Sequence, residues 1–141
     1  MMQDILFRAD APLTAEDWAL IDETVTTAAR RLLVGRRFLD IFGPPGAGLQ
    51  DIDYNLYGPD GEAVISLLGN EEPSYVQPLM RVHQHLPLIY KDFMLYWRDI
   101  ENARLLHTPL DTGAAAAAAL HVAKKEDELI FNGNESFGIQ G

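Results

Sequence analysis

Four histidines are the residues of this sequence best suited to metal binding or acid–base chemistry. His83 and His85 are separated by one residue, so on a strand both would point to the same face and one metal ion could use both. No carboxylate or third histidine stands at a suitable local spacing, and His107 and His121 are typical of surface or helix-end positions. We therefore expect His83 and His85 to be exposed or interfacial polar residues on an extended arm, with no metal site.

The acidic run Glu126-Asp127-Glu128 is the second candidate for chemistry. Adjacent residues of a helix point about 100° apart, so the three carboxylates cannot share one face. A di-iron centre would need Glu-x-x-His repeats on facing helices, and none is present. The glycine-rich residues 43–48 lack the Lys-Ser/Thr pair of a phosphate loop, and the sequence has no nucleophile elbow and no dinucleotide fingerprint. We expect no catalytic residue and no cofactor.

Composition restricts the classes of partner. The 141 residues suit about one domain, and 21 acidic against 11 basic residues give a formal net charge of -10, which attracts neither nucleic acid nor an anionic membrane. The absence of cysteine excludes a disulfide scaffold and an iron–sulfur cluster and suits a reducing cytoplasm. The first residues show no basic region followed by a long apolar run, and no run of about 18 apolar residues occurs, so we expect neither a secreted nor a membrane-spanning protein. We expect a cytoplasmic protein that binds neither nucleic acid nor membrane.

A first helix is predicted from Thr14. Its hydroxyl and the carboxylate of Asp17, three residues on, form the pattern of a capping box. Apolar residues recur at steps of three and four residues after it, and Gly35 is the natural stop.

Two more helices are predicted in the second half of the chain. Residues 98–106 form a short helix before Pro109. A long helix follows, capped by Asp111 or Thr112, with six successive alanines at 114–119, and ends at Gly133. The alanines are typical of a close packing face.

The remaining segments predict strands and turns. Residues 37–42 and 88–96 indicate strands, and residues 50–86 indicate a hairpin with a turn at 58–61, after which 63–65 resume a strand. A long two-stranded arm is marginal by itself, so we expect it to lie on another subunit. The fold class is α+β.

Three groups of residues, one from each part of the chain, form sequence motifs that can be compared with known families. They are Ala11-Pro12-Leu13-Thr14 with Trp18, Ile21-Asp22, Gly35-Arg36-Arg37-Phe38, Asp40 and Gly43-Pro44; Pro87-Leu88-Ile89-Tyr90-Lys91-Asp92-Phe93 with Trp97-Arg98-Asp99-Ile100-Glu101 and Arg104; and Glu126-Asp127-Glu128-Leu129-Ile130-Phe131 with Gly133 and Gly138-Ile139-Gln140-Gly141. Together they resemble the encapsulins, especially the large-shell members with ferritin-like cargo.

The resemblance implies the HK97 phage-capsid fold. Residues 1–49 would form the N-terminal arm and helix, residues 50–86 the extended loop (E-loop) that embraces a neighbouring copy, and residues 87–141 part of the peripheral domain, a strand and the spine helix. Copies would close into a homo-oligomeric icosahedral nanocompartment in the bacterial cytoplasm. The ferritin-like cargo enzyme implies a setting of iron storage and protection against oxidative stress.

The resemblance also implies a docking site for the targeting peptide of the cargo. Leu33 would supply an apolar wall, and Arg36 and Asp40 a polar rim. Two simpler interpretations stay open: Leu33 is a core residue, and Arg36 and Asp40, four residues apart, form an internal salt bridge. Some relatives hold a flavin near an aromatic residue, but Trp97 is not assigned that role.

Length is the main departure from the family, because encapsulin subunits are about twice as long. We expect the axial domain to be missing, with the complementary C-terminal portion of the subunit supplied as a separate chain. The alternative is a short capsid-like variant that acts as an enzyme or an enzyme partner, while the net charge argues against a viral capsid protein that packages nucleic acid. Either way we expect the alanine and leucine faces of the spine helix to be exposed.

Overall fold

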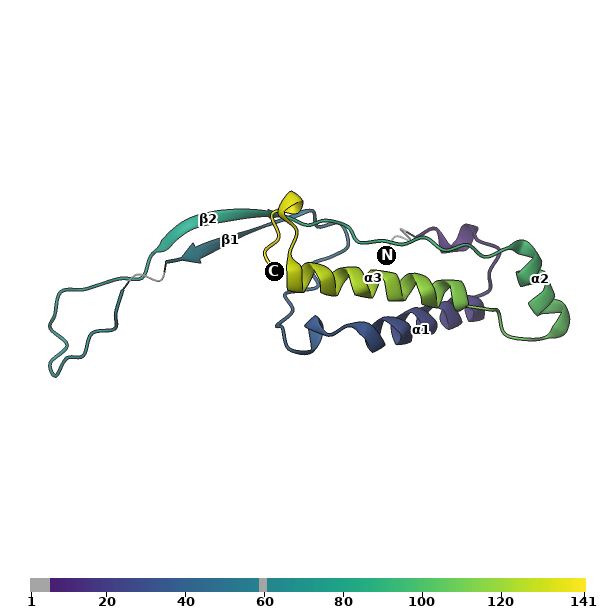
Figure 1. Ribbon diagram of the computed structural model, residues 1–141, viewed down its shortest axis with the longest axis horizontal. Coiled ribbons are helices and arrows are strands. Elements are labelled where there is room, and N and C mark those ends of the chain that lie inside the picture. Colours follow the sequence, from purple (N-terminus) through teal and green to yellow (C-terminus); the bar gives the residue numbers. More distant parts are fainter. Residues whose placement is uncertain (1–5, 59–60) are drawn as a thin grey trace. The chain divides into compact units, whose positions relative to one another are not determined.

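The computed structural model describes residues 6–58 and 61–141, and Figure 1 shows its helices and its one hairpin. The mixed α+β class is confirmed. The chain divides into two compact units. The helical unit comprises the described residues up to Ile41 with residues 88–133 and 140–141, and the hairpin unit comprises the described residues of 42–87 with residues 134–139.

Helix α1 spans Ala15–Leu32 and begins with the predicted capping box. The backbone N–H of Asp17 donates to Oγ1 of Thr14 at 3.2 Å, and the backbone N–H of Thr14 donates to Oδ2 of Asp17 at 2.9 Å. The helix ends earlier than predicted, at Leu32, and Gly35 instead opens a short 3₁₀ turn, η2, over Gly35–Arg37.

Helix α3, Gly113–Asn132, runs beside α1 as Figure 1 shows, and ends at Gly133 as predicted. Of the two predicted caps, Thr112 occupies the N-cap position without a side-chain cap bond, while Oδ1 of Asp111, one residue earlier, accepts from the backbone N–H of Gly113 at 2.8 Å. Helix α2, Trp97–Leu106, lies close to its predicted range. The core joins the elements of this unit through Ile21, Ile100, Leu110 and Ala115.

The alanine run provides the contact face of α3. The expectation that the alanine face is exposed is wrong for Ala115, Ala118, Ala119 and Ala123, which are buried while α3 packs against α1. Small side chains let two helix backbones approach closely, which is why alanine suits this seam. The expectation is correct for Leu120, which is exposed.

The hairpin unit holds a two-stranded antiparallel sheet. Strand β1, Asp51–Tyr57, pairs with β2, Pro78–His85, in a register that places Asp51 opposite His85 and Asp53 opposite His83. None of the described residues of this unit is buried. The predicted extended arm is confirmed, while Pro59 and Asp60 of the predicted turn lie outside the described residues.

Three predicted strands are wrong. Residues 37–42 begin with the end of η2 and continue without strand structure, and residues 63–65 and 88–96 are also outside any strand. A strand needs a partner to complete its backbone hydrogen bonds, and the described residues offer these segments none. Residues 89–91 instead pass along α3, where they line a hollow together with His121 and Val122.

None of the helices in the described part of the chain combines the length and the hydropathy that a membrane span requires.

Candidate functional site

The three residues assigned to peptide docking lie in the segment that follows α1. Leu33 is the residue directly after the helix and is half-buried. Arg36 lies within η2, and Asp40 lies three residues beyond it; both are exposed. The structure therefore brings Leu33, Arg36 and Asp40 to one end of α1, in the helical unit.

Asp127 on α3 holds this segment in place. Its carboxylate accepts hydrogen bonds from the backbone N–H of Val34 at 3.0 Å and of Gly35 at 3.1 Å. The approach is close, because a Cβ atom at Gly35 would lie 2.6 Å from Cδ1 of Ile130. The segment is thus anchored on α3 by a charge-assisted pair of hydrogen bonds and by a glycine that leaves room for Ile130.

Arg36 forms its salt bridge with Glu126 of α3. Nε of Arg36 lies 2.5 Å from Oε1 of Glu126, and Nη2 lies 2.9 Å from Oε2. The hydrogen bonds to Glu126 raise the pKa of Arg36 above its usual value. The alternative interpretation of an internal Arg36–Asp40 bridge is therefore wrong, since the guanidinium is engaged by a residue far along the chain.

Apolar side chains from the segment after α1 and from the end of α3 also contact each other. The rings of Phe38 and Phe131 are 5.9 Å apart, in a tilted arrangement, and both remain half exposed or more. Leu32 and Phe131 also line an open hollow of about 400 Å³ together with Asp127 and three further residues, Lys124, Glu128 and Asn132. The exposed apolar residues at this end of α1 and α3, which we call the α1-end surface, are Leu32, Val34, Phe38, Leu39 and Phe131.

Leu33 borders the α1-end surface. Its interpretation as a core residue is not supported, because it is only half-buried and does not belong to the core cluster around Ile21.

The three carboxylates of the acidic run on α3 each have a different partner. Glu126 pairs with Arg36, Asp127 accepts from the η2 backbone, and Glu128 pairs with Lys125 one turn back on α3. The hydrogen bond from Lys125 lowers the pKa of Glu128. As predicted, the three carboxylates do not converge on a common point.

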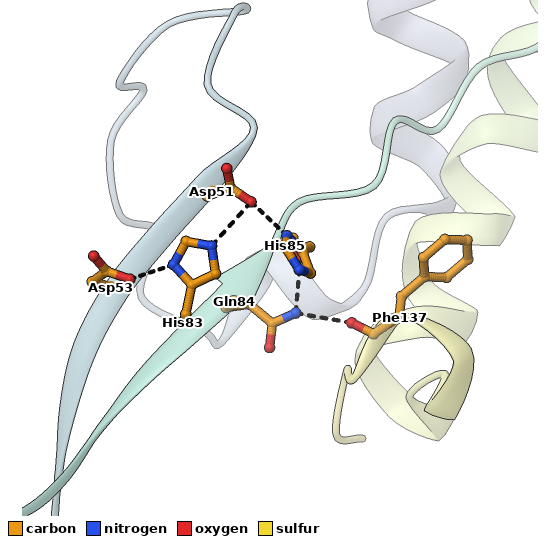
Figure 2. A network of polar contacts seen from close by, with 6 residues as sticks. All are labelled: Asp51, Asp53, His83, Gln84, His85 and Phe137. Atoms are coloured by element: carbon orange, nitrogen blue, oxygen red, sulfur yellow. Dashed lines mark hydrogen bonds and ion pairs between the residues drawn. The ribbon is translucent and has the colours of Figure 1, made fainter.

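The histidines occupy a different surface, in the hairpin unit. His83 and His85 lie on one face of β2, as predicted, and both are exposed. No carboxylate stands at a suitable local spacing, but the fold supplies two from about thirty positions away, because Asp51 and Asp53 face the histidines from β1. Figure 2 shows the four side chains together. The hydrogen bond to Asp53 raises the pKa of His83, and the charges of Asp53 and Asp51 add to the effect.

The other two histidines stand where the sequence places them. His107 is the residue at the C-terminal end of α2, and His121 is exposed on α3.

Sequence reasoning missed several contributors to both surfaces. The partners of Arg36 and of the η2 backbone are about ninety positions away, which no local spacing shows. A signal for the carboxylates was available: Asp51 and Asp53 have the same spacing as His83 and His85, as cross-strand pairs require. The turn predicted at 58–61 hid this cross-strand pairing, because a short turn implies a different register. The observed strands are joined by a much longer segment, residues 58–77.

Comparison with known proteins gives the class of the chain. The family Linocin_M18, described as "Encapsulating protein for peroxidase", matches residues 2–141. The chain belongs to this encapsulin family, and the resemblance inferred from its motifs is confirmed.

Individual relatives support the same assignment. The chain is 47% identical over 140 residues to the type 1 encapsulin shell protein EncA of Myxococcus xanthus, covering 99% of this chain and 49% of the relative. It is 43% identical over 129 residues to a diheme-cytochrome-encapsulin shell fusion protein of Kuenenia stuttgartiensis, covering 92% of this chain and 35% of the relative. A type 1 encapsulin shell protein of Rhodococcus erythropolis is 27% identical over 136 residues, 96% of this chain and 48% of that protein. The chain therefore spans about half the length of the curated shell proteins it matches, or less.

Proposed function

We propose that this chain is a structural part of an encapsulin shell subunit, whose copies close into an icosahedral compartment around cargo enzymes. The family match over residues 2–141, with 47% identity to a protein named as a shell protein, is the observation that carries the proposal. The proposed role is architectural, and we assign no catalytic residue and no cofactor.

We propose that the elements follow the HK97 capsid pattern. In this proposal residues 1–49 with α1 form the N-terminal arm and helix, residues 50–86 with β1 and β2 form the E-loop, and residues 87–141 with α3 form part of the peripheral domain. The exposed hairpin supports the E-loop role, because two strands without a core need a surface to lie on.

A second line of support comes from large apolar side chains that the fold leaves exposed. Ile65, Leu67 and Leu68 between the strands are almost wholly exposed, and Leu88 and Tyr90 in the segment before α2 are largely so. Contiguous exposed apolar surface marks sites of protein–protein contact. In the proposed shell, neighbouring copies cover each of these two segments.

We further propose that the targeting peptide of the cargo docks on the α1-end surface. Leu33 and the neighbouring apolar residues would contact apolar side chains of the peptide, and Arg36 and Asp40 would contact its polar groups. Glu126 fixes the guanidinium of Arg36 and so limits the entropy lost on docking. A ferritin-like, iron-oxidising cargo is the proposed occupant, which places the compartment in iron storage and protection against oxidative stress.

Electron microscopy of particles isolated from cells that produce this chain tests the shell proposal. We expect closed particles that contain the chain, resolved by gradient sedimentation and identified on a denaturing gel. A chain that sediments only as a small species, under conditions where a related shell protein closes, would contradict the proposal.

Cargo loading tests the docking surface separately. We expect the double variant Arg36→Glu, Asp40→Arg to assemble normally and to lose most of the cargo that cosediments with the wild type, as measured by mass spectrometry. The matched control is Asp92→Arg, Arg98→Glu, which makes the same exchange of charges at exposed positions of the helical unit. Equal loading in both variants would remove Arg36 and Asp40 from the docking site.

A further inference from the structure

The hairpin register gathers two aspartates and two histidines on one face of the β1–β2 sheet. Asp51 pairs with His85 and Asp53 pairs with His83. Alternate residues of a strand point to the same face, so the two cross-strand pairs lie side by side. Figure 2 shows the two imidazole rings on either side of the Asp51 carboxylate.

Three of these side chains direct ligand atoms toward one point. Oδ1 of Asp51 lies 2.5 Å from Nδ1 of His85 and 3.5 Å from Nε2 of His83. One ligand atom from each of the three residues lies within 4.8 Å of the others. The ligands of a tetrahedral zinc ion are about 3.3 Å apart, given metal–ligand distances of about 2.0–2.1 Å, so small side-chain rotations bring these atoms to that spacing.

Asp53 is not one of the three ligands, but its carboxylate holds the ring of His83 in position. Its Oδ1 lies 2.5 Å from Nδ1 of His83, within the distance at which a carboxylate accepts a hydrogen bond from a ring N–H. In the neutral ring with its proton on Nδ1, the other nitrogen, Nε2, carries the lone pair that a metal ion needs, and it lies 3.5 Å from Oδ1 of Asp51. A carboxylate that holds the far nitrogen of a histidine is the usual support for a histidine that binds a metal.

The ring geometry also suits a shared ion. The centroids of His83 and His85 are 5.1 Å apart, and the rings are nearly perpendicular, at 89°. The rings are therefore not stacked face to face, and both can present a nitrogen to a single ion. All three side chains are partly open to solvent, which leaves a coordination position for water.

We propose that Asp51, His83 and His85 bind one divalent transition-metal ion of the zinc type on the hairpin, with Asp53 positioning His83. Imidazole nitrogen and carboxylate oxygen are ligands that Zn²⁺ accepts, with water in the fourth position. The ion would join β1 to β2 in a unit whose described residues are all partly or wholly exposed, so it stabilises the hairpin. The site uses none of the docking residues. Its test is therefore independent of the shell proposal.

Isothermal titration calorimetry of the tag-free chain with ZnCl₂ tests the site. We expect one Zn²⁺ per chain for the wild type and at least about a hundredfold weaker binding for His83→Ala, His85→Ala, which removes two of three ligands. The control variant His107→Ala, His121→Ala removes the same number of histidines from α2 and α3 and should bind as the wild type does. The helical circular dichroism signal verifies that the helical unit of every variant is folded, and amide NMR shifts of β1 and β2 verify the hairpin.

Asp53→Asn tests the positioning role. We expect zinc binding about 10–100-fold weaker than in the wild type, with the stoichiometry unchanged. Imidazole NMR signals of His83 and His85 should shift together on addition of Zn²⁺, whereas those of His107 and His121 should not.

Two results would overturn the proposal. Equal zinc binding by the wild type and by His83→Ala, His85→Ala would place the ion elsewhere. No zinc binding by the folded wild type would reduce the cluster to hydrogen-bonded ion pairs between the two strands.

Discussion

The helical unit and the hairpin unit are stabilised in different ways. In the helical unit, α1 and α3 pack through small and branched apolar residues, and every buried residue of the described chain lies there. In the hairpin unit, the strands are joined by backbone hydrogen bonds and by polar side-chain pairs across them. Hydrophobic burial is the dominant favourable term in folding, so stability intrinsic to the chain is concentrated in the helical unit.

The largest test of this comparison is a core substitution in the helical unit. Ile21 is 3% exposed, and Ile21→Ala should lower the free energy of unfolding by about 2–5 kcal/mol. Leu67→Ala removes a similar volume from a fully exposed position of the hairpin unit. This variant should change the free energy of unfolding by less than about 0.5 kcal/mol. Urea denaturation followed by circular dichroism measures the free energy of unfolding of both variants. Similar losses would contradict the concentration of stability in the helical unit.

Hydrogen exchange measures the difference in stability between the two units without a substitution. Backbone amides in the middle of α1 and α3 should exchange at least about a hundredfold more slowly than those of β1 and β2 in the free chain, because opening a helix exposes the core. Equal protection in both units would mean that the hairpin has a source of stability beyond the strand pairing and polar pairs described.

A smaller effect is expected where η2 is anchored. Asp127→Ala leaves the backbone N–H groups of Val34 and Gly35 without their carboxylate, which should cost about 1–3 kcal/mol in the free energy of unfolding. Glu128→Ala, one residue on, breaks only an exposed pair with Lys125 and should stay within about 0.5 kcal/mol. Matching losses for both variants in urea denaturation would show that the anchor contributes nothing specific.

The smallest effect concerns Asp22, whose carboxylate accepts two hydrogen bonds of 2.7 Å from Arg8. The hydrogen bonds from Arg8 lower the pKa of Asp22 below 3.8. A group with a lowered pKa in the folded state stabilises the protein above its unfolded pKa, and this contribution is lost as the pH falls through the folded pKa.

Asp22→Asn should therefore reduce stability near neutral pH by less than about 1 kcal/mol, since the pair is largely exposed. The difference from the wild type should vanish well below pH 3.8. Glu23→Gln is the exposed neighbour for comparison. A difference that persists in acid would assign the effect to helix propensity instead.

The sequence predicted those elements whose signals are local. The capping box of Thr14 and Asp17, the end of α3 at Gly133 and the close packing of the alanine run depend on residues a few positions apart, and all three are confirmed. The expected exposure of the alanine face failed, because it depended on how α3 packs against α1. The strand predicted at residues 88–96 failed because a strand is defined by its partner.

The candidate sites show the same limit. Leu33, Arg36 and Asp40 were placed by resemblance, but the contact of Arg36 with Glu126 depends on the packing of α1 against α3. Likewise, His83 and His85 were expected on one face, whereas the facing carboxylates depended on a hairpin register that the turn signal misplaced. Long-range contacts of this kind follow from tertiary structure and cannot be obtained from residue spacing.

The exposed apolar segment between β1 and β2 has a consequence for the colloidal behaviour of the chain. Exposed apolar surface that favours association is provided by Val64, Ile65, Leu67 and Leu68. The net charge of -10, in contrast, makes two copies repel each other. Added salt shortens the range of the repulsion to about 8–10 Å near physiological ionic strength and leaves apolar adhesion intact. Ionic strength therefore sets the rate at which dispersed chains associate, and a buffer of low salt keeps the chain monodisperse for longest.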